Sequence, residues 1–171
     1  MAKSILLKVV TAGEGGVGKT TLLYRYIEGR FLADTRMTIG VEFFLKELNI
    51  EDKKILLQVW DFGGQEHFRP LLKSYARGAR GALILFDLTR PSSLSRIGQW
   101  VNICRQDNPD IPIIFIGTKL DLTHQITIDD AVALQLKEEF DFFDYVKVSS
   151  KTGENVQLVF ELLAKRLVTK I

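Results

Sequence analysis

The chain has 171 residues, which suits one globular domain and leaves no room for a second catalytic domain. Its 23 lysines and arginines against 21 acidic residues give a net charge of +2, so charge alone demands neither nucleic acid nor a membrane surface as partner. No apolar run approaches the roughly 18 residues that span a bilayer, and no signal peptide is recognisable. The one cysteine, Cys104, excludes an internal disulfide, and its helical neighbours predict a packing role. We therefore expect a cytoplasmic monomer that binds no nucleic acid.

Apolar runs rich in β-branched residues alternate along the chain with segments of helical spacing. In chain order, we expect a strand over 5–12, a helix over 18–28, strands over 41–50 and 54–61, a strand over 81–88, a helix over 92–106, a strand over 111–117, a helix over 128–139, a strand over 145–149 and a helix over 155–169. The short spacer 51–53 predicts an antiparallel hairpin. This order predicts a single α/β domain over 1–171, with a six-stranded, mostly parallel sheet and one antiparallel edge strand.

A glycine-rich segment follows the first predicted strand and opens the first helix. It reads Gly13-Glu14-Gly15-Gly16-Val17-Gly18-Lys19-Thr20 and matches the pattern G-x-x-x-x-G-K-[ST], with Thr21 directly after it. Glycines let successive backbone N–H groups point at one anion, and the helix N-terminus adds its positive dipole end. Lys19 then reaches the β- and γ-phosphates, and the Thr20 hydroxyl ligates Mg²⁺. A plain turn would not need the Lys-Thr pair, so the segment predicts a nucleoside triphosphate site without naming the base.

Two further segments stand at the ends of later predicted strands and can read a base. In Thr118-Lys119-Leu120-Asp121 the carboxylate can accept hydrogen bonds from N1–H and the 2-amino group of guanine, two donors that adenine lacks. We expect the Lys119 stem along the purine face with its ammonium in solvent. Ser149-Ser150-Lys151 can offer backbone N–H groups to guanine O6. A strand-end turn with solvated charges explains the first segment alone, but two such segments after a phosphate loop favour guanine.

The remaining candidate residues surround the end of the third predicted strand. Asp61 is placed to hold Mg²⁺ through water, Gly64 to present its N–H to a γ-phosphate, and Gln65 to orient an attacking water. Thr38 lies in a polar, irregular segment, and its hydroxyl is a candidate second Mg²⁺ ligand. The predicted metal ligands are thus Thr20, Thr38 and Asp61. The predicted catalytic residues are Gln65, Lys19 and Gly64.

These four motifs occur in an order and spacing that resemble the Ras superfamily of small GTPases over essentially the whole chain. The separations are 19 residues from Lys19 to Thr38 and 23 from Thr38 to Asp61. Within the superfamily the closest likeness is to Rab proteins, carried by three segments: Ile39-Gly40-Val41-Glu42-Phe43, Leu57-Gln58-Val59-Trp60-Asp61 and Tyr75-Ala76-Arg77-Gly78-Ala79.

The resemblance implies a P-loop small G-domain with about five helices on both faces of the sheet. It implies a molecular switch in trafficking or signalling that binds GTP or GDP with Mg²⁺ and hydrolyses GTP slowly unless an activating protein helps. Switch segments 34–42 and 61–76 would then control binding of effector, exchange-factor and activating proteins. By the same resemblance Phe31 flanks the guanine, and Gly15 stands where a side chain would crowd the transferring phosphate.

Four features depart from the family pattern. Thr118 stands where most members have Asn, which predicts one fewer amide contact to guanine. Phe62-Gly63 replaces the usual Thr-Ala, and in the first switch no tyrosine precedes Thr38, where Thr35 and Arg36 stand. The final residues 165–171 hold no cysteine that could be prenylated, so no lipid anchor is expected from this chain.

Several residues keep two interpretations. Arg36 is a solvated loop residue or an arginine supplied in cis to hydrolysis. His67 and His124 are expected in solvent, with a partner contact open for His67. The last helix packs on the sheet or lies on a membrane surface. A basic run is a solvated face or a surface for an acidic partner; it comprises Arg69, Lys73, Arg77 and Arg80.

Two rival functions also stay open. A small nucleotide or metabolite kinase would share Lys19 and Thr20 but would have no use for Asp121. A scaffold that holds GTP without turnover would keep every binding motif, although Gln65 favours the enzyme.

Overall fold

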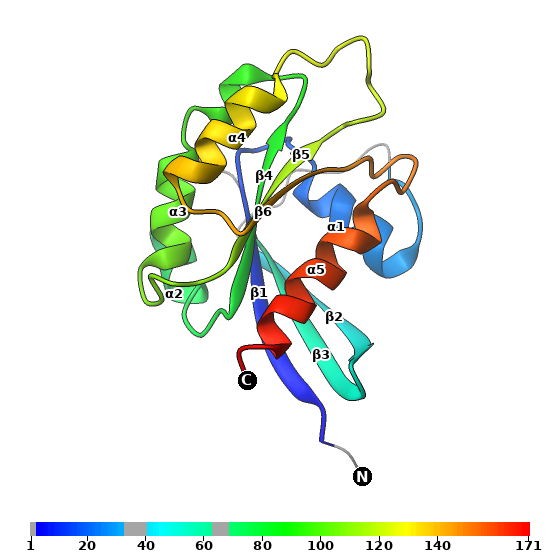
Figure 1. The fold of residues 1–171 in the computed structure, drawn as a ribbon, viewed down its shortest axis with the longest axis vertical. Coiled ribbons are helices and arrows are strands. Elements are labelled where there is room, and N and C mark those ends of the chain that lie inside the picture. The colour runs from blue at the N-terminus through cyan, green and yellow to red at the C-terminus, as the bar shows by residue number, and fades with distance from the viewer. Residues whose placement is uncertain (1–2, 33–40, 63–68) are drawn as a thin grey trace.

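The molecule is built around one twisted sheet with helices on both sides (Figure 1). A computed structural model describes residues 3–32, 41–62 and 69–171. The strand order is β2-β3-β1-β4-β5-β6. The strands are β1 (Ile5–Ala12), β2 (Val41–Ile50), β3 (Lys53–Phe62), β4 (Gly81–Asp87), β5 (Ile113–Thr118) and β6 (Asp144–Lys147). Every neighbouring pair is parallel except β2 with β3, which confirms the predicted mixed sheet.

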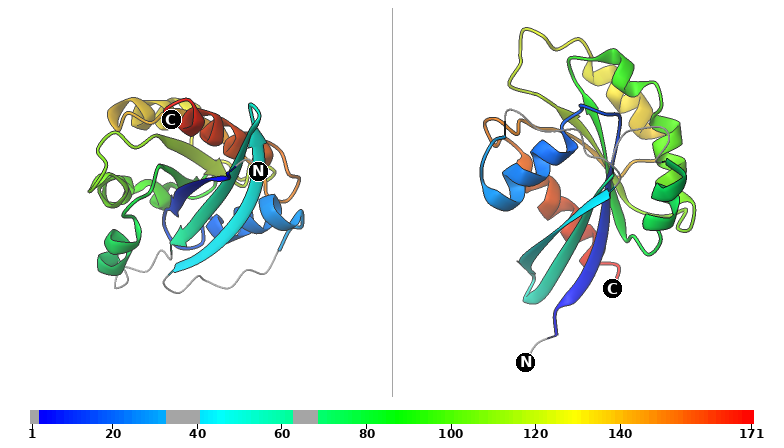
Figure 2. Two further views of the ribbon diagram at one scale, coloured as in Figure 1. Left: turned by 90° about the horizontal axis from the view of Figure 1, so that it is seen from below. Right: turned by 180° about the vertical axis from the view of Figure 1, so that it is seen from behind.

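Two layers of helices cover the two faces of the sheet. The helices are α1 (Lys19–Glu28), α2 (Arg69–Tyr75), α3 (Ile97–Arg105), α4 (Asp130–Glu139) and α5 (Val156–Val168), with a short 3₁₀ turn η2 (Pro91–Leu94) before α3. Figure 2 shows α1 and α5 on one side and α2, α3 and α4 on the other. Five α-helices in the described part of the chain agree with the prediction. None of these helices is long and apolar enough to cross a bilayer.

Burial follows the position of each strand in the sheet. β4 and β5 are buried along their whole length because they are central and covered on both faces, whereas the edge strand β2 alternates between exposed and half-buried residues. On one face α5 packs Val159, Leu163 and Leu167 into the core, so the sheet-packing interpretation of the last helix is confirmed. On the other face Cys104 is buried with Trp100, as expected for a packing residue.

Three local predictions differ from the structure. The hairpin turn holds Glu51 and Asp52 alone, with φ of 47° and 65°, because Lys53 already pairs with Ile50 in the ladder. The predicted helix over 92–106 is split into η2 and α3. The short helix α2 was missed because its seven residues give little periodicity to detect.

Candidate functional site

The segment between β1 and α1 wraps around the side chain of Lys19. Its ammonium is buried and donates hydrogen bonds to the carbonyl oxygens of Gly13 (2.8 Å) and Glu14 (2.9 Å). Gly13 has a φ of 147°, and a Cβ there would lie 2.4 Å from the carbonyl oxygen of Leu85, so only glycine fits. Burial lowers the pKa of Lys19 to about 8, against the opposing charges of Asp61 and Glu14. An anion in this loop would favour the charged lysine.

Two predicted metal ligands meet beside Lys19. The Thr20 hydroxyl donates to Oδ2 of Asp61 at 2.5 Å, and the Thr11 hydroxyl lies 3.3 Å from Oδ1 of the same carboxylate. The parallel register of β1 and β3 sets Thr11 opposite Asp61, which is fully buried. An adjacent hydroxyl and carboxylate suit a hard cation such as Mg²⁺, which takes further oxygens from water and phosphate.

Some predicted residues cannot be placed in this way. Thr38, Gly64 and Gln65 lie outside the described residues, as do Arg36 and His67. Within the described ranges no cluster of three or more His, Cys, Asp or Glu side chains could hold a metal ion by itself.

A pocket of about 370 Å³ adjoins the glycine-rich loop and gathers most of the residues predicted to bind the base and the phosphates. Four separate stretches of the chain line it: Gly16, Val17, Gly18, Thr21, Phe31, Leu32, Thr118, Lys119, Asp121, Leu122, Ser150 and Lys151. The volume falls within the usual range for ligand sites. Leu32 and Leu122 were not predicted, because nothing in their local sequence distinguishes them from core leucines.

Ser149 acts differently from the prediction. Its backbone N–H donates to the carbonyl oxygen of Glu154 at 3.1 Å, so this group is not available to a base. The Ser149 hydroxyl instead donates to Oδ1 of Asp121 at 2.8 Å. The turn closes on itself, and this leaves Ser150 and Lys151 as the pocket-lining members of the segment. Ser149 therefore orients the carboxylate that the sequence assigns to guanine.

The Lys119 side chain is partly exposed, and its ammonium also has two partners in the protein that were not predicted. Lys119 Nζ lies 2.7 Å from Oδ2 of the buried Asp87 and donates to the carbonyl oxygen of Gly16 at 3.3 Å. Burial alone would raise the pKa of Asp87, but hydrogen bonds from Lys119 and Thr89 and the charge of Lys119 outweigh it, so this pKa is lowered. Asp87 was not predicted as a site residue, because its partner Lys119 is 32 positions away in the chain.

Asp87→Asn is expected to reduce the free energy of unfolding by about 1–2 kcal/mol at neutral pH, because Lys119 loses a charged partner while staying partly solvated. The folded pKa lies below the unfolded value of about 3.9, so the wild-type contribution is present above pH 4 and disappears as the pH falls through the folded pKa. Urea unfolding between pH 3 and pH 7 measures this difference. Asp130→Asn is the control: it breaks an exposed pair with Lys147 and should cost under about 0.5 kcal/mol. Equal losses in both variants would contradict the prediction.

Thr118 joins the base pocket to the glycine-rich loop. Its hydroxyl lies 2.5 Å from the carbonyl oxygen of Val17 and 3.0 Å from that of Phe86, and the side chain is buried. The hydroxyl proton is thus shared between one carbonyl of the loop and one of β4. Thr118 therefore holds the loop against β4 and β5.

A row of aromatic side chains lies on β2 and β3 and continues onto α2. The rings of Phe43 and Trp60 are 5.7 Å apart and those of Trp60 and Tyr75 are 5.6 Å apart, and Phe43 and Tyr75 are exposed. Lys8 lies over the Trp60 ring at 4.4 Å. Phe43, Trp60 and Tyr75 come from three elements, so no local pattern in the sequence predicts the row.

The other predicted surface residues are exposed. Lys73, Arg77 and Arg80 face solvent near the end of α2, and Arg77 pairs with Asp107 at 3.6 Å. His124 is exposed, as expected.

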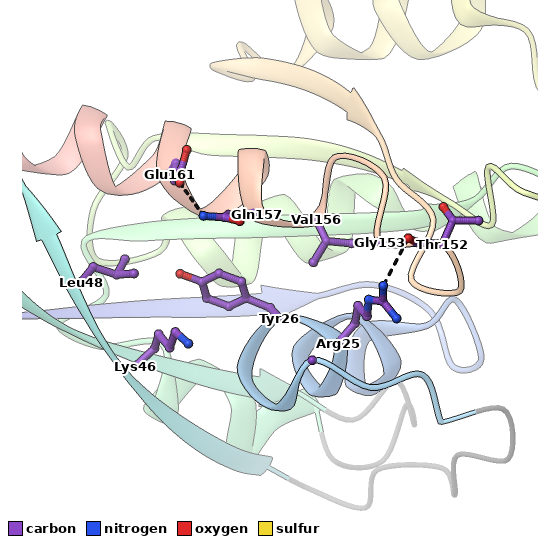
Figure 3. Close-up of a pocket in the computed structure, with 10 residues that line it drawn as sticks. Arg25, Tyr26, Lys46, Leu48, Thr152, Gly153, Val156, Gln157 and Glu161 are labelled. Atoms are coloured by element: carbon purple, nitrogen blue, oxygen red, sulfur yellow. Dashed lines mark hydrogen bonds between the residues drawn. The ribbon is translucent and has the colours of Figure 1, made fainter.

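A second pocket, of about 440 Å³, lies on the other side of α1, between α1, β2 and α5 (Figure 3). Arg25 at its rim donates to the carbonyl oxygen of Thr152 at 3.2 Å, and Gln157 donates to Glu161 across its α5 wall at 2.9 Å. Through Arg25, α1 supports the turn that carries Ser150 and Lys151.

Fold and site together define an α/β nucleotide-binding protein of the phosphate-loop class, with a pocket beside the loop that includes the Asp121 side chain. The family model described as "Ras family" matches residues 8–169. The chain is 37% identical over 171 residues to "Ras-related protein Rab11E" of Lotus japonicus, covering 95% of this chain and 78% of that protein. It is also 37% identical over 169 residues to "Ras-related protein Rab-2B" of Dictyostelium discoideum, covering 97% and 82%.

The chain belongs to the Ras family. It is a Rab-like small GTPase, a GTP-binding switch of trafficking regulation that hydrolyses GTP. Family membership therefore decides against the kinase and the inert scaffold that the sequence left open.

Proposed function

We propose that residues 1–171 act as one G domain in which the loop around Lys19 binds the phosphates of GTP. Lys19 and the loop N–H groups stabilise negative charge on the β- and γ-phosphates. Thr20, Asp61 and Thr38 hold Mg²⁺, which when bound neutralises charge on the phosphate oxygens. The observation that carries this proposal is the contact of Thr20 with the buried Asp61, at 2.5 Å, beside the buried Lys19 ammonium.

Hydrolysis in this proposal needs groups from the second switch. Gln65 orients the attacking water, and the N–H of Gly64 contacts the γ-phosphate. The sequence supports the assignment, because Gly64 and Gln65 come two and three positions after the end of β3, the strand that carries Asp61.

Guanine selection rests on Asp121, whose orientation is fixed by Ser149. Lys119, held by Asp87, lies along the base, and Phe31 flanks it. Both Phe31 and Asp121 line the same pocket, which supports the assignment.

Loss of the γ-phosphate is expected to release switch segments 34–42 and 61–76 and so change which proteins bind. We assign effector, exchange-factor and activating proteins to this face. The aromatic row of Phe43, Trp60 and Tyr75 supports this assignment, because it borders the described ends of both segments. We further propose that the protein works as a monomer in the cytoplasm.

The deciding experiment identifies the nucleotide extracted from freshly purified protein and then follows conversion of bound GTP to GDP. We expect guanine nucleotide and a single-turnover rate on the order of 10⁻⁴ to 10⁻³ per second without an activating protein. Removal of Mg²⁺ with EDTA should stop hydrolysis and speed nucleotide release. Adenine nucleotide in the extract would contradict the base assignment, and unchanged hydrolysis in EDTA would contradict the metal assignment.

A further inference from the structure

An arginine that the sequence did not single out contacts the phosphate loop. Arg90 stands between β4 and η2, where its N–H donates to the carbonyl oxygen of Asp87 at 3.0 Å and its own carbonyl accepts from the Ser93 hydroxyl at 2.7 Å. These bonds fix the backbone. The side chain then crosses to the loop, and Nη2 donates to the carbonyl oxygen of Gly15 at 2.8 Å, over 75 positions of sequence.

The guanidinium of Arg90 lies close against the loop and is half-buried. Its terminal nitrogens lie 3.8 and 3.9 Å from where a Cβ on Gly16 would be. Its Nε is buried and has no hydrogen-bond partner among the described residues. A half-buried arginine held this way loses much of its hydration, so its charge acts strongly on nearby groups.

No carboxylate in the described part of the chain balances the charge of Arg90. Among the described residues no Asp or Glu lies within 4.0 Å of it, whereas the neighbouring Arg96 approaches Glu14 at 3.9 Å. Arg90 also acts on Lys19, since its charge contributes to lowering the lysine pKa. Two cations that repel each other across one loop cost free energy until an anion lies between them. The phosphates of a nucleotide are such an anion.

We propose that Arg90 is a second cation of the phosphate site, a positioning residue that anchors the Gly15 carbonyl outside the loop and strengthens binding of nucleoside di- and triphosphates. This inference rests on the proposed phosphate-binding role of residues 13–20. Anchoring the carbonyl outward leaves the loop N–H groups turned toward the ligand, and the charge adds an attraction that grows with the number of phosphates. Arg36, the arginine considered from the sequence, lies outside the described residues, whereas Arg90 donates directly to a backbone carbonyl of the loop.

The test compares Arg90→Gln, which keeps an N–H donor but loses the charge, with Arg90→Lys, which keeps the charge. Dissociation constants for GMP, GDP and GTP are measured by competition against a fluorescent GDP at low and high KCl. We expect Arg90→Gln to weaken GDP and GTP about tenfold at low salt and GMP less than about twofold. High salt should shrink the difference, and Arg90→Lys should restore most of the affinity.

Arg80→Gln is the matched control, because Arg80 is exposed at the opposite end of β4 and its loss changes the net charge equally. All three affinities should stay at the wild-type value in this variant. If Arg90→Gln weakens the affinities for GMP, GDP and GTP equally, and Arg90→Lys does not restore them, Arg90 only stabilises the loop structure. This result would overturn the proposal. Unchanged affinities in both variants would overturn it too. Failure of the proposed function is distinguishable, since the wild-type protein would then not bind guanine nucleotide at all.

Discussion

Asp121→Asn is expected to change the base preference of the pocket from guanine to xanthine. In the proposed role the Asp121 carboxylate accepts two hydrogen bonds from guanine, and an amide in its place presents an N–H₂ group to the 2-amino group, donor against donor. Xanthine carries an oxygen at that position and accepts from the amide. Because Ser149 donates to Oδ1 of Asp121 at 2.8 Å, the amide oxygen is held at that site and the N–H₂ group takes the other.

The expected size of this effect is large. Loss of one charge-assisted hydrogen bond, loss of the charge from the other and a new donor–donor contact should together weaken GDP by about 1,000-fold, since a hydrogen bond to a charged group contributes about 1.5–3 kcal/mol. Competition between GDP and XDP for the purified variant measures the reversal. Ser149→Ala gives a graded comparison: it loosens the carboxylate and should weaken GDP only about tenfold. A variant Asp121→Asn that still prefers GDP would remove Asp121 from base recognition.

Gln65→Leu is expected to slow single-turnover GTP hydrolysis by about 10- to 100-fold while leaving GDP and GTP affinity nearly intact. In the proposed mechanism the Gln65 amide orients the attacking water, and leucine has no polar group to do so. The substitution leaves Lys19 and Asp121, the proposed binding residues, unchanged.

Single-turnover hydrolysis and nucleotide dissociation, measured on the same preparation, separate the two effects. Gln58→Leu is the matched control, because it makes the same substitution on β3, in a strand position away from the loop around Lys19. It should hydrolyse GTP at the wild-type rate. Hydrolysis that is equally fast in Gln65→Leu would take Gln65 out of the mechanism.

The elements of the fold could be predicted because each carries its own local signal. The strand Ile5–Ala12 and the strand Val41–Ile50 have the predicted bounds, since a run of apolar or alternating residues ends where glycine or turn residues begin. Helix α2 gave no such signal. The split of the predicted helix over 92–106 depends on Pro91 and on the Ser93 hydroxyl, which bonds to the N–H of Asp87.

The chain by itself determined which groups can do the chemistry. The glycine pattern, the Lys19-Thr20 pair and Asp121 follow from residue types at fixed spacing, because a phosphate loop and a base-reading carboxylate need those groups wherever they occur. The alternation of strands and helices also predicted that these motifs lie together at the carboxyl ends of the strands.

Only the tertiary structure decided how those groups are held. Ser149 turns Asp121, Asp87 holds Lys119, and Arg90 reaches Gly15, over separations of 28, 32 and 75 positions. No local pattern encodes such pairs, since each partner is an ordinary polar residue until packing brings the two together and removes water from between them. Burial then increases the contribution of each pair to stability, because a charge or polar group without its partner costs far more free energy in the interior than at the surface.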